Sequence, residues 1–347
     1  MNGHGGHSNG VVGIVDTRQG EHYANHSDPS SSANGVSVAN GYPAPSPTPY
    51  QLHNEAIVDH LYHAGFQTGN YADTILHVHQ NAYRLHAIIL SRSPFLAHLM
   101  STSPQSAGQR AIYVHLENEP EVTVEGFAIA LGYLYSAVSL NLLRPENARG
   151  VLAAACLLGG MDDLANYAYE VCRQSISVDN ISQWLEFVDA IPTPTDGSST
   201  PVEPHHMPPS RTAIFGAFAD RLKNDVLHFL VVTLPSVLNV HGLSSPSTPS
   251  ADGQSSDAGR DTLLQIFSRV PFDLFKAAVE SPSFQIGSDQ ARFKFAKDAI
   301  ETRKRGIARG QGAEETVVLA FGQNNFGGSA VHVTRKLRKR PLWKVNS

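Results

Sequence analysis

The sequence predicts an α+β fold in which a small sheet with helices is followed by an all-helical region. Residues 74–78 are β-branched and apolar and return through a Gln80-Asn81 turn, which is typical of a hairpin. From His86 onward, apolar residues recur at three- and four-residue intervals, which places them on one face of a helix. Residues 1–49 are rich in Gly, Ser, Asn and Pro, which predicts a disordered low-complexity tail before the fold.

Composition disfavours several classes of protein. The 347 residues allow two domains of about 150 residues each. Charged residues make up 16% and the formal net charge is -5, which argues against direct nucleic-acid binding. We expect neither a signal peptide nor a membrane span, because the sequence shows no apolar run suited to either. The two cysteines, Cys156 and Cys172, lie in helix-like patterns, which predicts a reducing compartment, the nucleus or the cytoplasm.

The first predicted helix runs from Asn54, which can cap it, to about Ala64, before a possible stop at Gly65. Its apolar stripe consists of Ile57, Val58, Leu61 and Tyr62. An amphipathic helix outside a core needs a partner for its stripe, so these four residues predict a homodimer interface. The alternative is that the stripe packs only within its own subunit.

The central part of the sheet domain combines strands with a helix. Residues 74–78 and 82–85 form the predicted hairpin, and the alternation at 111–116 predicts a third strand. The apolar spacing of residues 86–100 predicts one buried helix between them. Three further helical patterns follow, at 127–138, 148–158 and 164–172, and the Gly159-Gly160 pair separates the last two into a helical hairpin.

The second half of the chain is predicted to be mainly helical. Two Pro-, Ser- and Thr-rich stretches, 192–210 and 244–259, are interpreted as flexible insertions. Thr316 to Phe321 is compatible with a strand. Near the end, basic residues crowd together as Arg335, Lys336, Arg338, Lys339 and Arg340. This run predicts a nuclear-import peptide or a polyanion contact, with a solvated tail or a docking segment as alternatives.

Candidate catalytic and metal-binding groupings are weak. Asp73 and His86 suggest acid–base chemistry, but no third orienting group or nucleophile motif accompanies them. His77 and His79 alternate in a strand pattern, yet two ligands do not make a metal site. We therefore expect no enzyme activity, no metal and no cofactor.

The order of these elements resembles a BTB/POZ domain followed by a BACK-like helical region. The signature residues that carry the resemblance are Asp73, His86, Ser93 and Phe95, followed by apolar Leu96 and Met100. FAIALGYLY at 127–135 and the helical hairpin at 151–172 are similar to later helices of the BTB/POZ family. The spacing from His86 to Ser93 is similar to that of fungal and germ-cell-less-type BTB proteins. The resemblance implies structural rather than catalytic roles for the four signature residues.

The resemblance also implies a domain organisation. A BTB/POZ domain is expected at 50–175 and a BACK-like helical domain at 176–310, with a basic tail at 311–347 after them. The implied function is protein–protein interaction: a homodimeric adaptor or scaffold, with a cullin ubiquitin ligase among its possible partners. The alternatives are a nuclear transcriptional co-regulator that acts through protein contacts and, least favoured, a metal-dependent enzyme.

Two departures from the family pattern bear on these alternatives. Ala87 follows the signature histidine where many members carry Lys or Arg, which weakens the implied corepressor pocket. The loop after Met100 reads STSPQSAGQR and lacks the apolar-x-Glu element that is frequent in ubiquitin-ligase adaptors. Functional surfaces are therefore expected on the first helix and in this loop.

Overall fold

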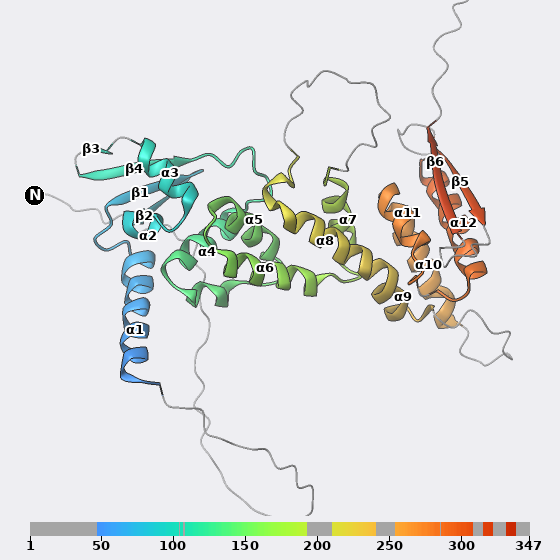
Figure 1. Ribbon diagram of the computed structural model, residues 1–347, viewed down its shortest axis with the longest axis horizontal. Coiled ribbons are helices and arrows are strands. Elements are labelled where there is room, and N and C mark those ends of the chain that lie inside the picture. The colour runs from blue at the N-terminus through green and yellow to red at the C-terminus, as the bar shows by residue number, and fades with distance from the viewer. Residues whose placement is uncertain are drawn as a thin grey trace, which may run out of the picture. The chain divides into compact units, whose positions relative to one another are not determined.

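The computed structural model describes residues 47–103, 105–106, 108–192, 210–240, 254–284, 286–307, 315–321 and 331–337 (Figure 1). The predicted α+β class is confirmed, since a small sheet with helices precedes a mainly helical region. The chain divides into two compact units. The first comprises Met1–Glu117, Ala128–Leu142 and Leu158–Met161, and the second comprises Asn118–Phe127, Leu143–Leu157 and Asp162–Ser347. Nearly all of the predicted tail, residues 1–46 of 1–49, lies outside the described residues.

The first unit contains a four-stranded sheet with the order β2-β1-β4-β3. Its strands are β1 Thr74–Val78, β2 Asn81–Leu85, β3 Gln105–Ser106 and β4 Gln109–Val114. The predicted hairpin is confirmed, because β1 pairs antiparallel with β2, and β1 also pairs in parallel with β4. Leu76, Val78, Ile112 and Val114 are buried, and they alternate with more exposed residues, as in a sheet with one face on the core.

The first helix begins earlier and ends differently than the sequence predicts. Helix α1 spans Pro49–His60 and is capped by Thr48, whose hydroxyl accepts from the Gln51 amide at 3.3 Å. The Gln51 side chain accepts in turn from the Thr48 amide at 2.7 Å, which completes a capping box. The chain then continues as the π-helix η1, Leu61–Gln67. Gly65 lies buried inside η1 and does not end the helix.

The helix predicted at residues 86–100 is two helices, α2 Ala87–Leu90 and α3 Pro94–Thr102. The break has a local cause. Pro94 has no amide hydrogen to continue the first helix, and the Ser93 hydroxyl accepts from the Leu96 amide at 3.2 Å to cap the second. Both helices still bury the apolar positions that the spacing predicted, including Leu90, Leu96 and Met100.

The remaining helices up to residue 175 follow the sequence pattern. They are α4 Val124–Tyr135, the 3₁₀ helix η2 Ala137–Leu142, α5 Ala148–Leu158 and α6 Asp162–Ser175. Gly126 of α4 and Gly150 of α5 meet backbone to backbone, since a Cβ on Gly126 would lie 2.4 Å from the Gly150 carbonyl carbon. Gly159 and Gly160 separate α5 from α6 with φ angles of 67° and 68°, a conformation that favours glycine.

The second unit continues as a set of helices around an aromatic core. Its later elements are α7 Ile181–Asp189, η3 Ala213–Phe215, α8 Ala217–His228, η4 Phe229–Thr233, α9 Leu234–Val237, α10 Gln254–Arg269, α11 Phe272–Glu280 and α12 Asp289–Ile307. Phe267 of α10 lies 5.1 Å from Phe295 of α12 and 5.2 Å from Phe284, centroid to centroid. This cluster joins two helices and a loop into one core. None of the described helices is both long and apolar enough to cross a bilayer.

The two predicted insertions have different outcomes. Of residues 192–210, only Pro192 and Ser210 are described, so that prediction lies almost wholly outside the described residues. The prediction for 244–259 is wrong in its last part, because residues 254–259 form the start of α10. A Cβ on Gly259 would lie 2.2 Å from the Leu238 carbonyl oxygen. The glycine that suggests a loop in the sequence therefore permits close packing instead.

The predicted basic tail begins with a hairpin. Strand β5, Glu315–Phe321, matches the predicted strand and pairs antiparallel with β6, Val331–Leu337. Val331 and Val333 are fully buried, and the Val333 amide donates to the Glu280 carboxylate at 2.7 Å. Part of the segment 311–347 therefore belongs to the packed second unit.

Candidate protein-interaction surface

Helix α1 presents apolar side chains to solvent. None of its residues is buried, and Figure 1 shows it in blue, extending away from the sheet of the same unit. Tyr50 is 74% exposed, Leu52 52%, Ile57 47% and Val58 38%. Exposed apolar surface of this kind is typical of protein-interaction sites.

A shallow groove lies beside α1. It has a volume of about 380 Å³ and is lined by Asn54, Glu55, Val58, Asp59, Ser136 and Val138. Val58 and Val138 contribute apolar side chains to its lining, and Glu55 and Asp59 contribute carboxylates. This combination suits an apolar side chain of a docking helix.

The four residues of the predicted dimer stripe have different environments. Ile57 and Val58 are exposed, and Leu61 is half-buried. Tyr62 is only 4% exposed and packs inside its own unit, with its ring 5.6 Å from that of Phe66. The predicted stripe is therefore wrong at Tyr62, because the π-helical turn that begins at Leu61 interrupts the α-helical spacing.

The signature histidine, His86, is held by contacts to the backbone and to one tyrosine. Its Nε2 lies 2.8 Å from the Asn70 carbonyl oxygen, which can only accept, so Nε2 carries the proton. Its Nδ1 lies 3.0 Å from the Tyr135 hydroxyl, which also accepts from the His86 amide at 2.9 Å. Burial raises the pKa of Tyr135, and the negative charge of Asp73 adds to that effect. Both nitrogens of His86 therefore serve the fold.

Asp73 acts as a cap rather than as an acid–base partner. Its Oδ1 accepts from the Ala87 amide at 2.7 Å, at the start of α2, and from the Thr74 hydroxyl at 3.0 Å. Neither bond is to His86, so the two residues do not form a catalytic pair in this arrangement. Ala87, where many family members carry a basic residue, contributes its backbone amide to this contact.

Ser93 ties α3 to the end of α5. Its hydroxyl is fully buried and donates to the Leu158 carbonyl at 2.5 Å. Phe95, the next signature residue, is half-buried in the first turn of α3. The partner that sequence reasoning missed is Tyr135, which lies within the recognised motif at 127–135 but whose hydroxyl contact spans 49 positions to His86.

His77 and His79, which the sequence places on one strand face, do not gather into a metal site. His77 stacks on Tyr113 with ring centroids 4.7 Å apart, while His79 lies beyond the end of β1 in a turn with a φ of 52°. Within the part of the chain that the structure describes, no three His, Cys, Asp or Glu side chains are placed to hold a metal ion.

The predicted basic run is divided. Arg335 and Lys336 belong to β6, where they pair with Val317 and Thr316 of β5. Arg338, Lys339 and Arg340 lie outside the described residues. The predicted nuclear-import run therefore begins in β6 and continues beyond the described residues, and nuclear import stays a prediction.

Comparison with known proteins found two relatives. The chain is 27% identical over 299 residues to BTB/POZ domain-containing protein 2 of Schizosaccharomyces pombe, covering 84% of this chain and 92% of that protein. It is 24% identical over 142 residues to Germ cell-less protein-like 2 of Homo sapiens, covering 41% of this chain and 26% of that protein. No family model matches the chain. The two relatives confirm the resemblance to BTB/POZ proteins that the signature residues predicted.

Proposed function

We propose that this chain, a BTB/POZ protein by its similarity to these relatives, is an adaptor or scaffold that forms a homodimer through helix α1. The relatives support membership of a protein-interaction family. The observation that carries the dimer is the exposed apolar surface of α1, which includes Ile57 and Val58; Val58 also lines the groove together with Val138. A second copy offers the same helix, so the contact can be isologous, as in most homodimers.

The dimer is tested by size-exclusion chromatography with light scattering. We expect the parent chain to elute as a dimer and Ile57→Asp to shift it toward the monomer, because a charge replaces an apolar contact. The matched control is Ala56→Asp, which adds the same charge at an exposed position on the side of α1 away from Ile57 and Val58 and should leave the mass unchanged. A parent chain that is monomeric, or a dimer that persists in Ile57→Asp, contradicts the proposal.

Recruitment of a cullin ubiquitin ligase is the more specific form of the adaptor proposal. BTB/POZ similarity supports it, whereas the loop after Met100 lacks the apolar-x-Glu element. Affinity purification of the full chain, probed for cullins, decides between this role and a scaffold that binds none. Because BTB/POZ proteins are generally interaction modules, the proposal includes no enzymatic step.

A nuclear co-regulator is the second candidate, and the basic run supports it. We propose residence in the nucleus or the cytoplasm, with Arg338, Lys339 and Arg340 directing import. Replacing these three by alanine should reduce nuclear accumulation of a fluorescent fusion. Arg335 and Lys336 are left intact because they lie in β6. Unchanged nuclear entry would remove the basic run from the proposal.

A further inference from the structure

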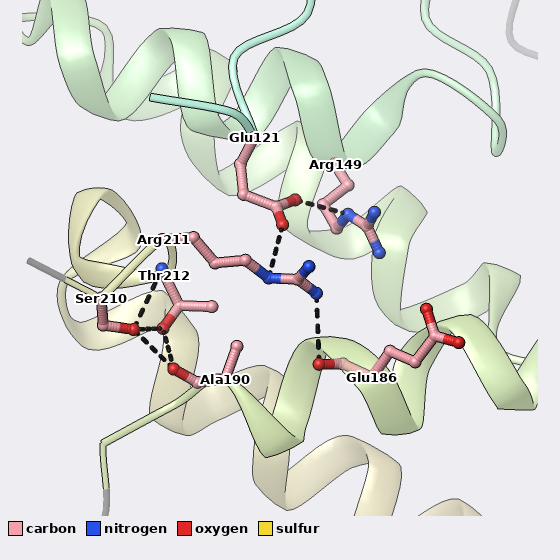
Figure 2. Close-up of polar contacts among 7 residues, drawn as sticks. All are labelled: Glu121, Arg149, Glu186, Ala190, Ser210, Arg211 and Thr212. Atoms are coloured by element: carbon pink, nitrogen blue, oxygen red, sulfur yellow. Dashed lines mark hydrogen bonds and ion pairs between the residues drawn. The ribbon is translucent and has the colours of Figure 1, made fainter. Parts of the chain in front are cut away.

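A buried carboxylate in the second unit holds two arginines. Glu121 is 7% exposed, and its two oxygens contact different side chains. Oε2 lies 3.0 Å from Nε of Arg149, and Oε1 lies 3.3 Å from Nε of Arg211 (Figure 2). No sequence pattern predicts this cluster, because Glu121, Arg149 and Arg211 are distant along the chain.

The two guanidinium groups are fixed by further contacts. The Arg149 guanidinium carbon lies 5.5 Å from the Phe187 ring centroid and 5.9 Å from that of Trp184, within the range of cation–π attraction. Arg211 donates from Nη2 to the Glu186 carbonyl at 3.2 Å. Such contacts hold a guanidinium in place before a ligand arrives and so reduce the entropic cost of binding.

The segment that carries Arg211 is itself anchored. The hydroxyls of Ser210 and Thr212 both donate to the Ala190 carbonyl, at 2.5 Å and 3.1 Å. Figure 2 shows these contacts beside the Arg211 side chain. Arg211 is therefore fixed on both sides along the chain, although it follows the undescribed residues 193–209.

Arg149 keeps hydrogen-bonding capacity. A guanidinium has five N–H donors, and Arg149 uses Nε for Glu121. Among the described residues, its two terminal nitrogens make no hydrogen bond, and in Figure 2 they point away from Glu121 without a dashed line. Two parallel terminal donors match the oxygens of a carboxylate.

These donors border a cavity of about 630 Å³. Its lining lies wholly in the second unit and includes Glu121, Glu146, Arg149, Gln183, Trp184 and Arg211. Arg149 comes from the first turn of α5, and Gln183 and Trp184 come from the first turn of α7. The partial positive charge of two helix starts adds to the attraction for an anion.

The balance of charge selects the kind of anion. Glu121, Arg149 and Arg211 sum to one positive charge. Glu146, the other charged residue of the lining, brings the formal sum to zero, but it is exposed, so solvent screens its charge more than that of buried Glu121. A single negative charge completes this set, whereas a phosphate dianion would leave excess negative charge. We propose that the cavity binds a peptide segment of a partner protein, with an Asp or Glu carboxylate on Arg149 and a neighbouring apolar side chain against Trp184.

The test selects peptides from a phage-displayed library of random twelve-residue sequences against the full chain. We expect selected peptides to carry Asp or Glu beside an apolar residue. Changing that acidic residue to its amide in a synthetic peptide should weaken binding at least about tenfold. Arg149→Lys should weaken binding of the acidic peptide to a similar extent, because a lysine keeps the charge beside Glu121 but has no planar fork.

The arginine and peptide changes should be non-additive, since both remove one contact. Arg173→Lys is the matched control. Arg173 pairs with exposed Glu170 and does not line the cavity, so this substitution should leave peptide binding unchanged. Thermal unfolding confirms that each variant is folded, and Arg149→Gln serves as a second variant. The proposal is overturned by selection of no peptide, by equal binding to Arg149→Lys, or by tighter binding of a phosphoserine version. It does not depend on dimerisation through α1.

Discussion

At the scale of single residues, buried polar groups define the first unit. Tyr135 is 4% exposed, and its hydroxyl joins the amide and the ring of His86. Ser93, which is fully buried, donates to the Leu158 carbonyl, and exposed Asp73 accepts from the Ala87 amide. A buried donor left without a partner costs more than an ordinary hydrogen bond contributes, so the hydroxyls of Tyr135 and Ser93 have specific structural tasks.

Removing the Tyr135 hydroxyl should destabilise the fold. Tyr135→Phe leaves the His86 amide and ring nitrogen without this partner, which should lower the free energy of unfolding by about 1–3 kcal/mol. Urea denaturation followed by circular dichroism measures the change. Tyr71→Phe is the control, because Tyr71 is 95% exposed and should change stability little. Equal stability of both variants would show that the His86 contact is dispensable.

The two thiols should make stability depend on alkaline pH. Burial raises the pKa of Cys156 from 9.0 to about 11 and that of Cys172 to about 12, the latter opposed by Arg149. Above pH 9 the thiols of the unfolded chain ionise while those of the folded chain remain protonated, so ionisation stabilises the unfolded state relative to the folded one. Stability should therefore be full below pH 9 and fall as pH rises toward 11 and 12.

Replacing both cysteines by alanine separates this effect from other alkaline transitions. The double variant should show a shallower loss of stability between pH 9 and 11 in urea titrations at a series of pH values. In the parent chain, the native thiols should react with a disulfide reagent at pH 8 far more slowly than the unfolded ones. Rapid modification of both thiols in the native state would contradict the burial of Cys172.

At the scale of elements, the main corrections occur where the backbone departs from a regular helix. The π-helix η1 turns Tyr62 inward, and Pro94 divides the predicted helix of 86–100. At Gly126 and Gly259, the absence of a side chain allows backbones to approach closely. Such departures depend on a neighbouring element, so local periodicity predicts that helices exist better than it predicts where they break.

Gly160 should be intolerant of a side chain. Its φ is 68°, and a Cβ would lie 2.6 Å from the Arg92 carbonyl oxygen, a backbone atom that cannot move aside easily. Gly160→Ala should lower the free energy of unfolding by about 2 kcal/mol or more, since strain and a clash combine. The measurement is chemical denaturation of the purified variant.

Gly108→Ala is the matched control for this prediction. Gly108 has a φ of 82°, also in the left-handed region, but no atom lies within 4 Å of its Cβ position. Gly108→Ala should lower the free energy of unfolding only by the conformational cost of a side chain at positive φ, about 1–2 kcal/mol. A larger loss at Gly108 than at Gly160 would refute the role of the close approach to Arg92.

At the scale of the whole molecule, the chain forms two compact units whose limits differ from the expected domains. The expected BTB/POZ boundary at residue 175 coincides with the end of α6, yet α6 and most of α5 group with the second unit. Similarly, β6 lies in the predicted tail but packs on α11. The domain boundaries 50–175 and 176–310 remain predictions. The two compact units are defined by contacts between distant segments and need not share these boundaries.

The contribution of β6 to the second unit can be measured directly. Val333→Asp places a charge at a fully buried position and should lower the free energy of unfolding by about 3 kcal/mol or more. Thr334→Asp is the control, since the neighbouring side chain is exposed. If both variants unfold at the same urea concentration as the parent chain, β6 does not stabilise the unit.

The sequence alone determined the fold class, the hairpin of β1 and β2, and most of the helices, because the periodic spacing of apolar side chains is visible in short segments of the chain. It also carried the signature through which the BTB/POZ resemblance was found. Only the tertiary structure decided that Tyr62 faces inward, that Tyr135 holds His86, and that Glu121 joins Arg149 to Arg211. Those contacts join residues far apart in the chain, and side-chain spacing holds no information about which distant groups will meet.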